Sequence, residues 1–405
     1  MKYLVLLADG MADYKYDVLD GKTLLQYART PNMDKLAPVS LLGTARTIPP
    51  GLAPGSDVAN LAVMGYDPQR YYTGRSPLEA VSLGVDMGEQ DLSLRCNLVT
   101  LSEDNNYADK IMLDYSAGEI SSAESAQLMA AIEATLGKAE LKFYAGISYR
   151  HLLLWKNARG KSMQLTPPHD ISDRRIGAHL PQGDDARILM ELMQASQTIL
   201  KNHPVNQART EKGLNPANSI WLWGDGFRPN MDSFTDKYGL KGSVVCAVDL
   251  VRGLGICAGL TPVAVEGATG SIKTNFAGKA RAALDELKRG QDFVYLHIES
   301  PDEAGHQGDM KAKIWAIEQI DQQVLGLVLE EIAGFDDLRV LVMPDHPTPV
   351  SIKTHSTDPV PFMLYDKNHP QASSAREFNE VTAAGGTYFA DGYKLMDYFI
   401  RGLNR

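Results

Sequence analysis

The sequence has 405 residues, 44% of them hydrophobic and 22% charged, which is the balance of a globular protein rather than of a disordered, collagen-like or disulfide-stapled chain. At about 150 residues per domain, this length predicts two or three domains. Lys and Arg number 40 and Asp and Glu 50, so the net charge is −10. That charge argues against nucleic acid or an anionic membrane as partner, but it is compatible with a small anionic substrate.

The three cysteines, Cys96, Cys246 and Cys257, form no CxxC pair and suggest no disulfide framework. A reducing cytoplasm is therefore the expected location. The first apolar run, residues 3–8, ends at Asp9 and is too short for a signal peptide. Since no stretch approaches 18 apolar residues, no transmembrane helix is expected.

The run 3–8 is almost continuously apolar, which predicts a buried parallel strand with a turn at Asp9 and Gly10. The middle of the chain differs, with short strand-like runs and two helical runs between Pro- and Gly-rich pieces. The strands are expected at residues 92–101, 141–147, 151–155, 220–223 and 243–248, and the helices at 121–136 and 185–201. This pattern predicts a smaller α/β domain, residues 91–262, inserted into a discontinuous α/β core domain of residues 1–90 and 263–405.

The core pattern returns after the insertion. Apolar runs at 293–298 and 338–343 predict two more buried strands, and 361–365 predicts a fourth. Between them, residues 310–332 carry apolar side chains at helical spacing, with Glu318, Asp321 and Gln322 on the opposite face. A strand, a crossover helix and a strand predict parallel pairing.

Acidic and histidine residues follow the ends of three of these predicted strands. Each motif alone is most often a turn or a helix cap, but the carboxyl ends of parallel strands are where α/β sheets bind ligands. The residues are Asp9, Asp302, His306, Asp345, His346 and His355. Carboxylates and imidazoles in similar number favour Mn²⁺, Zn²⁺ or Mg²⁺ over a thiolate site. Six such residues are enough for two metal ions, an arrangement common in phosphoryl transfer.

Ser56 lies at the predicted start of a helix, where backbone N–H groups favour a phosphate. A metal ion on its oxygen would lower the hydroxyl pKa and make Ser56 a nucleophile. The bland alternative is a helix cap.

Taken together, these motifs resemble the alkaline phosphatase superfamily, and more closely the archaeal-type cofactor-independent (2,3-bisphosphoglycerate-independent) phosphoglycerate mutases, a family also found in bacteria. The resemblance is carried by Ala8-Asp9-Gly10, Pro54-Gly55-Ser56-Asp57, Pro301-Asp302-Glu303-Ala304-Gly305-His306, Asp345-His346-Pro347-Thr348-Pro349 and His355. Further matching segments are Tyr72-Thr73-Gly74-Arg75, Arg95-Cys96-Asn97-Leu98-Val99, Ser148-Tyr149-Arg150-His151-Leu152, Pro168-His169-Asp170, His203-Pro204-Val205-Asn206 and Gly267-Ala268-Thr269-Gly270. They span essentially the whole chain.

The resemblance implies two metal sites in an alkaline-phosphatase-like core domain. It assigns Asp302, His306 and His355 to one, and Asp9, Ser56, Asp345 and His346 to the other, with Ser56 as the phosphorylated nucleophile. It implies two divalent ions, Mn²⁺ first and Zn²⁺, Mg²⁺ or Co²⁺ as alternatives, and no 2,3-bisphosphoglycerate.

The inserted domain is expected to hold the glycerate part of the substrate. The substrate-binding candidates are Arg150, His151, His169, Arg252 and Lys279, and the candidate general base is Asp170. A purely structural role is an equal expectation for each of these binding residues. His297 is set aside as structural, because it alternates with Tyr295 and Glu299 along one strand.

The function implied is the interconversion of 3-phosphoglycerate and 2-phosphoglycerate. A homoserine kinase or a phosphatase with the same metal residues is the alternative enzyme, and a non-catalytic interaction protein is the alternative of another class. The sequence leaves the metal identity, the acceptor and the oligomeric state open, a homo-oligomer included.

Overall fold

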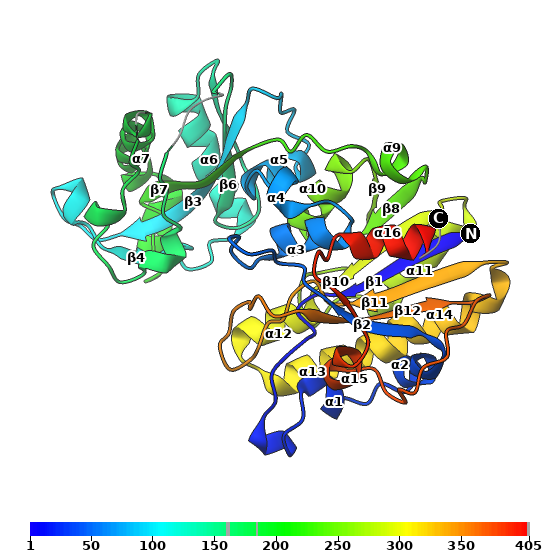
Figure 1. Ribbon diagram of the computed structural model, residues 1–405. Coiled ribbons are helices and arrows are strands. Elements are labelled where there is room, and N and C mark those ends of the chain that lie inside the picture. The colour runs from blue at the N-terminus through cyan, green and yellow to red at the C-terminus, as the bar shows by residue number, and fades with distance from the viewer. Residues whose placement is uncertain (159–162, 184, 403–405) are drawn as a thin grey trace. The chain divides into compact units, whose positions relative to one another are not determined.

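The computed structural model describes residues 1–158, 163–183 and 185–402 (Figure 1). The chain divides into two compact units, which we call the first unit (residues 1–72 and 230–405) and the second unit (residues 73–229). Each contains strands and helices, and the mixed α/β fold class predicted from the sequence is confirmed.

An eight-stranded sheet forms the centre of the first unit. Its strands are β1 (Lys2–Ala8), β2 (Leu41–Ala45), β8 (Gly242–Val245), β9 (Thr261–Val263), β10 (Phe293–Ile298), β11 (Leu338–Met343), β12 (Val360–Asp366) and β13 (Thr387–Phe389), in the order β13-β2-β12-β11-β1-β10-β8-β9. Strand β1 pairs in parallel with both β10 and β11. Strands β10 and β11 are therefore parallel, as the strand–helix–strand pattern predicts, but they do not pair with each other because β1 lies between them. Strand β12 is antiparallel to its neighbours. The ends of β1, β10 and β11 therefore lie side by side.

Helices cover both faces of this sheet (Figure 1). The α-helices of the first unit are α1 (Leu24–Tyr27), α2 (Pro31–Leu36), α3 (Ser56–Val63), α4 (Pro68–Tyr71), α9 (Phe234–Tyr238), α10 (Asp249–Cys257), α11 (Phe276–Lys288), α12 (Ser300–Gln307), α13 (Met310–Gln319), α14 (Gly326–Glu331), α15 (Glu380–Ala384) and α16 (Lys394–Arg401). The first unit also contains three short 3₁₀ turns: Asp17–Leu19, Ala37–Val39 and Ile332–Gly334. Alternate residues of β1 face opposite layers: Leu4 and Leu6 join the cluster with α11 and α13, whereas the Tyr3 ring meets Phe399 of α16.

The crossover segment between β10 and β11 departs from the single helix expected over 310–332. It runs as α13, a π-helix (Ile320–Leu325) and α14. Asp321, expected on the solvated face, is fully buried instead. Its carboxylate accepts the backbone N–H groups of Asn32 (3.2 Å) and Met33 (2.8 Å) at the start of α2. The wider π turn rotates this side chain away from solvent, and tertiary contact with α2 overrides the helical period.

The second unit has a five-stranded sheet with β3 at its centre. Its strands are β3 (Leu92–Leu101), β4 (Met112–Asp114), β5 (Leu141–Tyr144), β6 (Arg150–Trp155) and β7 (Ser219–Phe227), and β3 pairs antiparallel with β4, β6 and β7. The helices are α5 (Ser76–Ser82), α6 (Ser122–Leu136), α7 (Ala186–Lys201) and α8 (Pro204–Glu211), with 3₁₀ turns Tyr107–Asp109, Pro168–Ile171 and Gly177–His179. Apolar residues of β3, α6 and α7 make its core.

The limits of the two units differ from the expected boundaries at 90/91 and 262/263. Strand β8 pairs in parallel with β10, and β9 with β8, so these two strands extend the first sheet rather than the insertion. Helix α5 packs on β3 and β7 and belongs to the second unit. Local pattern could not show this, because a strand's sheet is decided by its pairing partner.

Over the described part of the chain, every helix is too short or too polar to cross a lipid bilayer.

Candidate metal centre

The candidate metal ligands gather in the first unit where β1, β10 and β11 end. Asp9 follows β1, Asp302 and His306 lie on α12 directly after β10, and Asp345 and His346 follow β11. His355 lies further along the loop after β11. Three neighbouring parallel strands bring these residues to one sheet edge.

Asp302, His306 and His355 form a first group. The Asp302 oxygens lie 3.3 Å from Nε2 of His306 and 3.3 Å from Nε2 of His355, and the two Nε2 atoms are 2.9 Å apart. Nδ1 of His306 faces the Lys353 carbonyl (3.1 Å), and Nδ1 of His355 faces the Pro54 carbonyl (3.4 Å). Because a carbonyl oxygen can only accept, these contacts place the ring proton on Nδ1 and leave Nε2 as the ligand atom.

The electrostatics of this group favour a cation. Burial alone would raise the pKa of Asp302, but before a metal ion binds, with a proton in its place on Nε2, hydrogen bonds from His306 and His355 and the nearby histidine charges hold that pKa well below its ordinary value. The Asp302 carboxylate in turn raises the pKa of His306. A site that attracts a proton onto histidine also attracts a divalent ion, and two Nε2 lone pairs beside a carboxylate suit such an ion.

Asp9, Asp345, His346 and Ser56 form a second group. Nε2 of His346 lies 3.1 Å from Ser56 Oγ, 3.3 Å from Asp345 Oδ2 and 3.7 Å from Asp9 Oδ1. Ser56 is the first residue of α3 and is half-buried. The rings of His346 and His355 lie 3.8 Å apart, so the two groups adjoin.

The second group also fits a divalent ion. Burial and the charges of Asp345, Asp302 and Glu299 raise the pKa of Asp9 well above its ordinary value. Asp9 Oδ1 is buried and has no hydrogen-bond partner within the described part of the chain. Buried carboxylates next to one another are costly without a compensating positive charge, which a metal ion would provide.

Two residues that the sequence reasoning did not select hold this group in place. The Asn60 side chain donates from Nδ2 to Asp345 Oδ2 (2.8 Å), and its Oδ1 accepts the Tyr295 hydroxyl (2.6 Å). His297, set aside as structural, contacts Asp9 Oδ2 through Nε2 (2.8 Å). Burial lowers the pKa of His297 to about 3, so the ring is neutral, and the tautomer with its proton on Nε2 donates this hydrogen bond to an ionised Asp9. His297 lies one residue before the end of β10 and opposite Leu7 of β1. Its position next to a predicted strand end was the signal in the sequence that it could lie near Asp9.

A third residue near the centre was also missed. Glu299 offers a carboxylate oxygen close to those of Asp9 and Asp302. It precedes Asp302 by three residues, so the strand-end argument could have included it.

Lys279 and Arg252 both lie in the first unit. Lys279, on α11, is fully buried, and its Nζ donates to the His297 carbonyl (3.3 Å). Burial lowers the pKa of Lys279 to about 8, against the charges of Cys246, Glu299 and Asp9. Arg252, expected in the insertion, lies in the first unit because its helix α10 packs on α3, and its side chain is exposed.

The remaining substrate-binding candidates lie in the second unit. Arg150 is exposed at the start of β6, with its guanidinium 5.6 Å from the Tyr149 ring centre. His169 and Asp170 are exposed in the turn Pro168–Ile171, 3.7 Å apart. His151 is buried: its Nδ1 accepts the Gly146 N–H (3.0 Å), and burial lowers its pKa to about 3. The neutral His151 ring is enclosed, and its Nε2 has no hydrogen-bond partner within the described residues.

Two arginines that the sequence reasoning did not select lie in the same region. Arg95 stacks on the Trp223 ring (4.4 Å) and donates to Glu79 (2.9 Å). Arg75 donates to the same carboxylate (3.2 Å). Burial lowers the pKa of His169, and the charges of Arg95 and Arg75 lower it further. The His169 ring meets the Trp223 ring edge-on, with the ring centres 5.3 Å apart. Two arginines near His169 are groups that could bind an anion, and Glu79 and Asp170 balance their charge.

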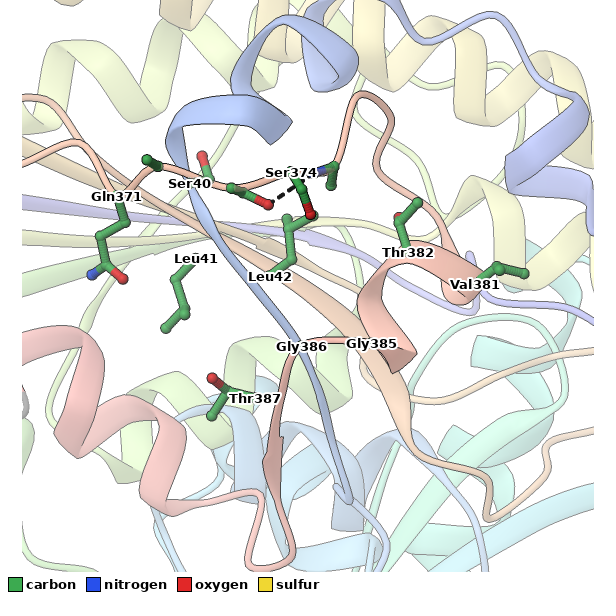
Figure 2. Close-up of a pocket in the computed structure, with 13 residues that line it drawn as sticks. Ser40, Leu41, Leu42, Gln371, Ser374, Val381, Thr382, Gly385, Gly386 and Thr387 are labelled. Atoms are coloured by element: carbon green, nitrogen blue, oxygen red, sulfur yellow. Dashed lines mark hydrogen bonds between the residues drawn. The ribbon is translucent and has the colours of Figure 1, made fainter.

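A separate open cavity of about 700 Å³ lies at the edge of the first sheet, beside β2 and β13 (Figure 2). Serine, threonine and apolar residues line it, among them Ser40, Leu42 and Thr387. None of its lining residues is titratable, so it offers neither metal ligands nor charge for a phosphate.

Comparison with known proteins identifies relatives of this chain. A family model described as 2,3-bisphosphoglycerate-independent phosphoglycerate mutase matches residues 37–206. A protein of Geobacter sulfurreducens, named as a probable member of that family, is 50% identical over 401 residues, covering 99% of this chain and 100% of that protein. A Methanothrix thermoacetophila protein with the family name is 49% identical over 404 residues, covering 99% and 100%.

Solved structures include relatives as well. A Pyrococcus horikoshii protein superposes with a TM-score of 0.84 at 31% identity, covering 100% of this chain and 97% of that one. A cofactor-independent phosphoglycerate mutase from Thermoplasma acidophilum gives 0.68 at 26% identity, covering 99% of each chain. The full-length identity to the curated relatives is decisive, and the chain belongs to the 2,3-bisphosphoglycerate-independent phosphoglycerate mutase family.

Proposed function

We propose that this chain interconverts 3-phosphoglycerate and 2-phosphoglycerate through a phosphoserine at Ser56. The observation that carries the proposal is the position of Ser56 Oγ, 3.1 Å from His346 at the start of α3, beside two groups of metal-ligand type. Backbone N–H groups and the dipole at a helix start favour a phosphoryl group.

The residues would hold two divalent ions as the family resemblance divides them. Asp302, His306 and His355 would hold one ion, and Asp9, Ser56, Asp345 and His346 the other. The ions, Mn²⁺ in the first instance, would lower the pKa of the nucleophile and stabilise charge on the phosphoryl oxygens.

The chain's own residues account for the transfer. Ser56 Oγ gives up its proton to a base and bonds to phosphorus as the ester bond to glycerate breaks, and the freed glycerate oxygen takes up a proton from that base to become a hydroxyl. Glycerate then reorients, and its other hydroxyl loses a proton to a base and takes the phosphoryl group back from Ser56. Asp170 is our candidate for that base.

The second unit would bind the anionic part of the substrate. Arg150 and His169 are accessible there, and the guanidinium groups of Arg75 and Arg95 lie near His169. An arginine matches a planar carboxylate with two parallel hydrogen bonds. Water must be kept from phosphoserine, since its attack would make the enzyme a phosphatase.

The test is an assay with 3-phosphoglycerate and Mn²⁺ and without 2,3-bisphosphoglycerate. We expect 2-phosphoglycerate to form with little release of inorganic phosphate. Release of phosphate as the main product would show a phosphatase. A parallel mixture of homoserine and ATP should give no product, and product there alone would show a kinase.

A further inference from the structure

Thr348 lies between the two candidate metal groups without belonging to either. It follows β11 in the loop that carries His346 and His355, and it is fully buried. Its hydroxyl donates to Asp302 Oδ1 (2.5 Å), in the first group. The same oxygen lies 3.2 Å from Nδ1 of His346, in the second group.

The donor and acceptor roles of this hydroxyl have one solution. A threonine hydroxyl carries a single proton and two acceptor lone pairs. The ionised Asp302 carboxylate can only accept, so the short hydrogen bond uses that proton. The Thr348 oxygen is then an acceptor toward His346, and Nδ1 of His346 must carry the ring proton.

The consequence is a defined ligand atom. With its proton on Nδ1, the neutral His346 ring presents an unprotonated Nε2 to Ser56, Asp345 and Asp9. In His306 and His355 a backbone carbonyl faces Nδ1 instead. His346 alone among the three has a side chain as the Nδ1 partner.

The surroundings hold Thr348 in position. The buried ammonium of Lys313 donates to its carbonyl oxygen (2.8 Å), and to Asp13 Oδ2 (2.7 Å). Two glycines leave room for it: a Cβ at Gly305 would lie 2.5 Å from the Thr348 carbonyl oxygen, and a Cβ at Gly10 would lie 2.5 Å from Oγ1. Its methyl and hydroxyl groups therefore have fixed places.

We propose that the Thr348 hydroxyl fixes His346 in the Nδ1–H tautomer while it holds Asp302, and so positions one ligand of each metal ion. Thr348 is a positioning residue, and it couples the two ions because one hydroxyl serves both. The proposal rests on the two-metal centre of the proposed function. Removal of a side chain that hydrogen-bonds a metal ligand commonly lowers metal affinity by about 10–100-fold.

The experiment compares Thr348→Val, which removes the hydroxyl at nearly constant shape, with Thr348→Ser, which keeps it. Thr100→Val is the matched control, because Thr100 is also buried and its hydroxyl donates to the Pro216 carbonyl in the second unit (2.8 Å). Nitrogen-15 NMR of metal-free protein reads the ring tautomers, with the His346 signal identified by its disappearance in His346→Gln. Calorimetry measures Mn²⁺ binding.

Wild-type, Thr348→Ser and Thr100→Val proteins should show His346 as Nδ1–H. Thr348→Val should show a mixture or Nε2–H at His346 alone, and should bind both Mn²⁺ ions about 10–100-fold more weakly. An Nε2–H tautomer in wild-type protein would overturn the proposal, even if Thr348→Val failed to fold. Unchanged tautomer or unchanged affinity in Thr348→Val would do the same. Neither readout uses substrate, so a failure of the mutase assay remains distinguishable.

Discussion

Ser56 is the residue on which the proposed chemistry depends most. Ser56→Ala should lower turnover by roughly 10⁴-fold or more, because the group that takes the phosphoryl is gone. The fold should persist, since the Ser56 hydroxyl meets His346 and does not cap α3. Steady-state assays and phosphoenzyme trapping measure the effect, and Ser374→Ala, an exposed serine of the same unit, is the control. Near-normal turnover in Ser56→Ala would rule out the phosphoserine route.

His306 allows the metal assignment to be tested by stoichiometry. Removal of one of three ligands should release about one equivalent of metal while the other ion stays. Elemental analysis of His306→Ala after gel filtration measures it. His369→Ala is the control, because His369 is exposed beside Asp366, in another part of the first unit. Two full equivalents in His306→Ala would show that His306 is not a ligand.

Arg150 tests the substrate end. Because its side chain is exposed, Arg150→Ala should leave stability unchanged. The transition state for 3-phosphoglycerate should be bound more weakly by about 2 kcal/mol, a fall of roughly 30-fold in kcat/KM, because the variant cannot form one charge-assisted hydrogen bond. Arg175→Ala is the matched control, an exposed arginine of the same unit paired with Asp109. Equal kinetics in the two variants would remove Arg150 from the binding site.

At the scale of elements, the π-helix in the crossover segment places Asp321 where its carboxylate stabilises the start of α2. Asp321→Ala should lower the free energy of unfolding by about 2–3 kcal/mol, since backbone N–H groups of α2 lose a charged acceptor. Denaturant unfolding measures it. Gln322→Ala, its exposed neighbour, should stay within about 0.5 kcal/mol of wild type. If Asp321→Ala also changed the free energy of unfolding by no more than about 0.5 kcal/mol, Asp321 would not stabilise α2.

At the scale of the whole molecule, the candidate metal centre should link stability to pH. The ordinary pKa of Asp9 is 3.8, and in the folded metal-free protein it lies well above that value. Between the two pKa values the folded state binds more protons than the unfolded state, so stability falls as pH rises. The melting temperature of metal-free wild type should therefore fall relative to Asp9→Asn as pH rises above about 4.

Mn²⁺ should reverse this penalty at about pH 7, because the ion replaces the proton as the compensating charge. Melting curves of both proteins in chelator and in Mn²⁺, across roughly pH 4.5 to 8, measure both effects. A wild-type protein whose melting temperature rises with pH relative to Asp9→Asn would contradict the assignment. The cytoplasmic location, and any self-association, stay predictions from the sequence.

The sequence by itself determined the fold class, the strand-end residues and the family. Continuous apolar runs predict buried parallel strands. Acidic or histidine residues directly after such strands come together when the strands are neighbours in the sheet. Pairing and contact decided the rest. Strand β8 belongs to the first sheet because it pairs with β10, and β9 because it pairs with β8. Asp321 is buried because its carboxylate binds backbone N–H groups of α2.

Only the tertiary structure showed that Asn60, His297 and Thr348 contact the candidate metal ligands. It also showed that His151 is enclosed and that Arg95 lies near His169. Ligand type and spacing are local properties that a sequence displays. A hydrogen bond between residues nearly 300 positions apart, such as that from His297 to Asp9, exists only when the sheet brings the two strands together.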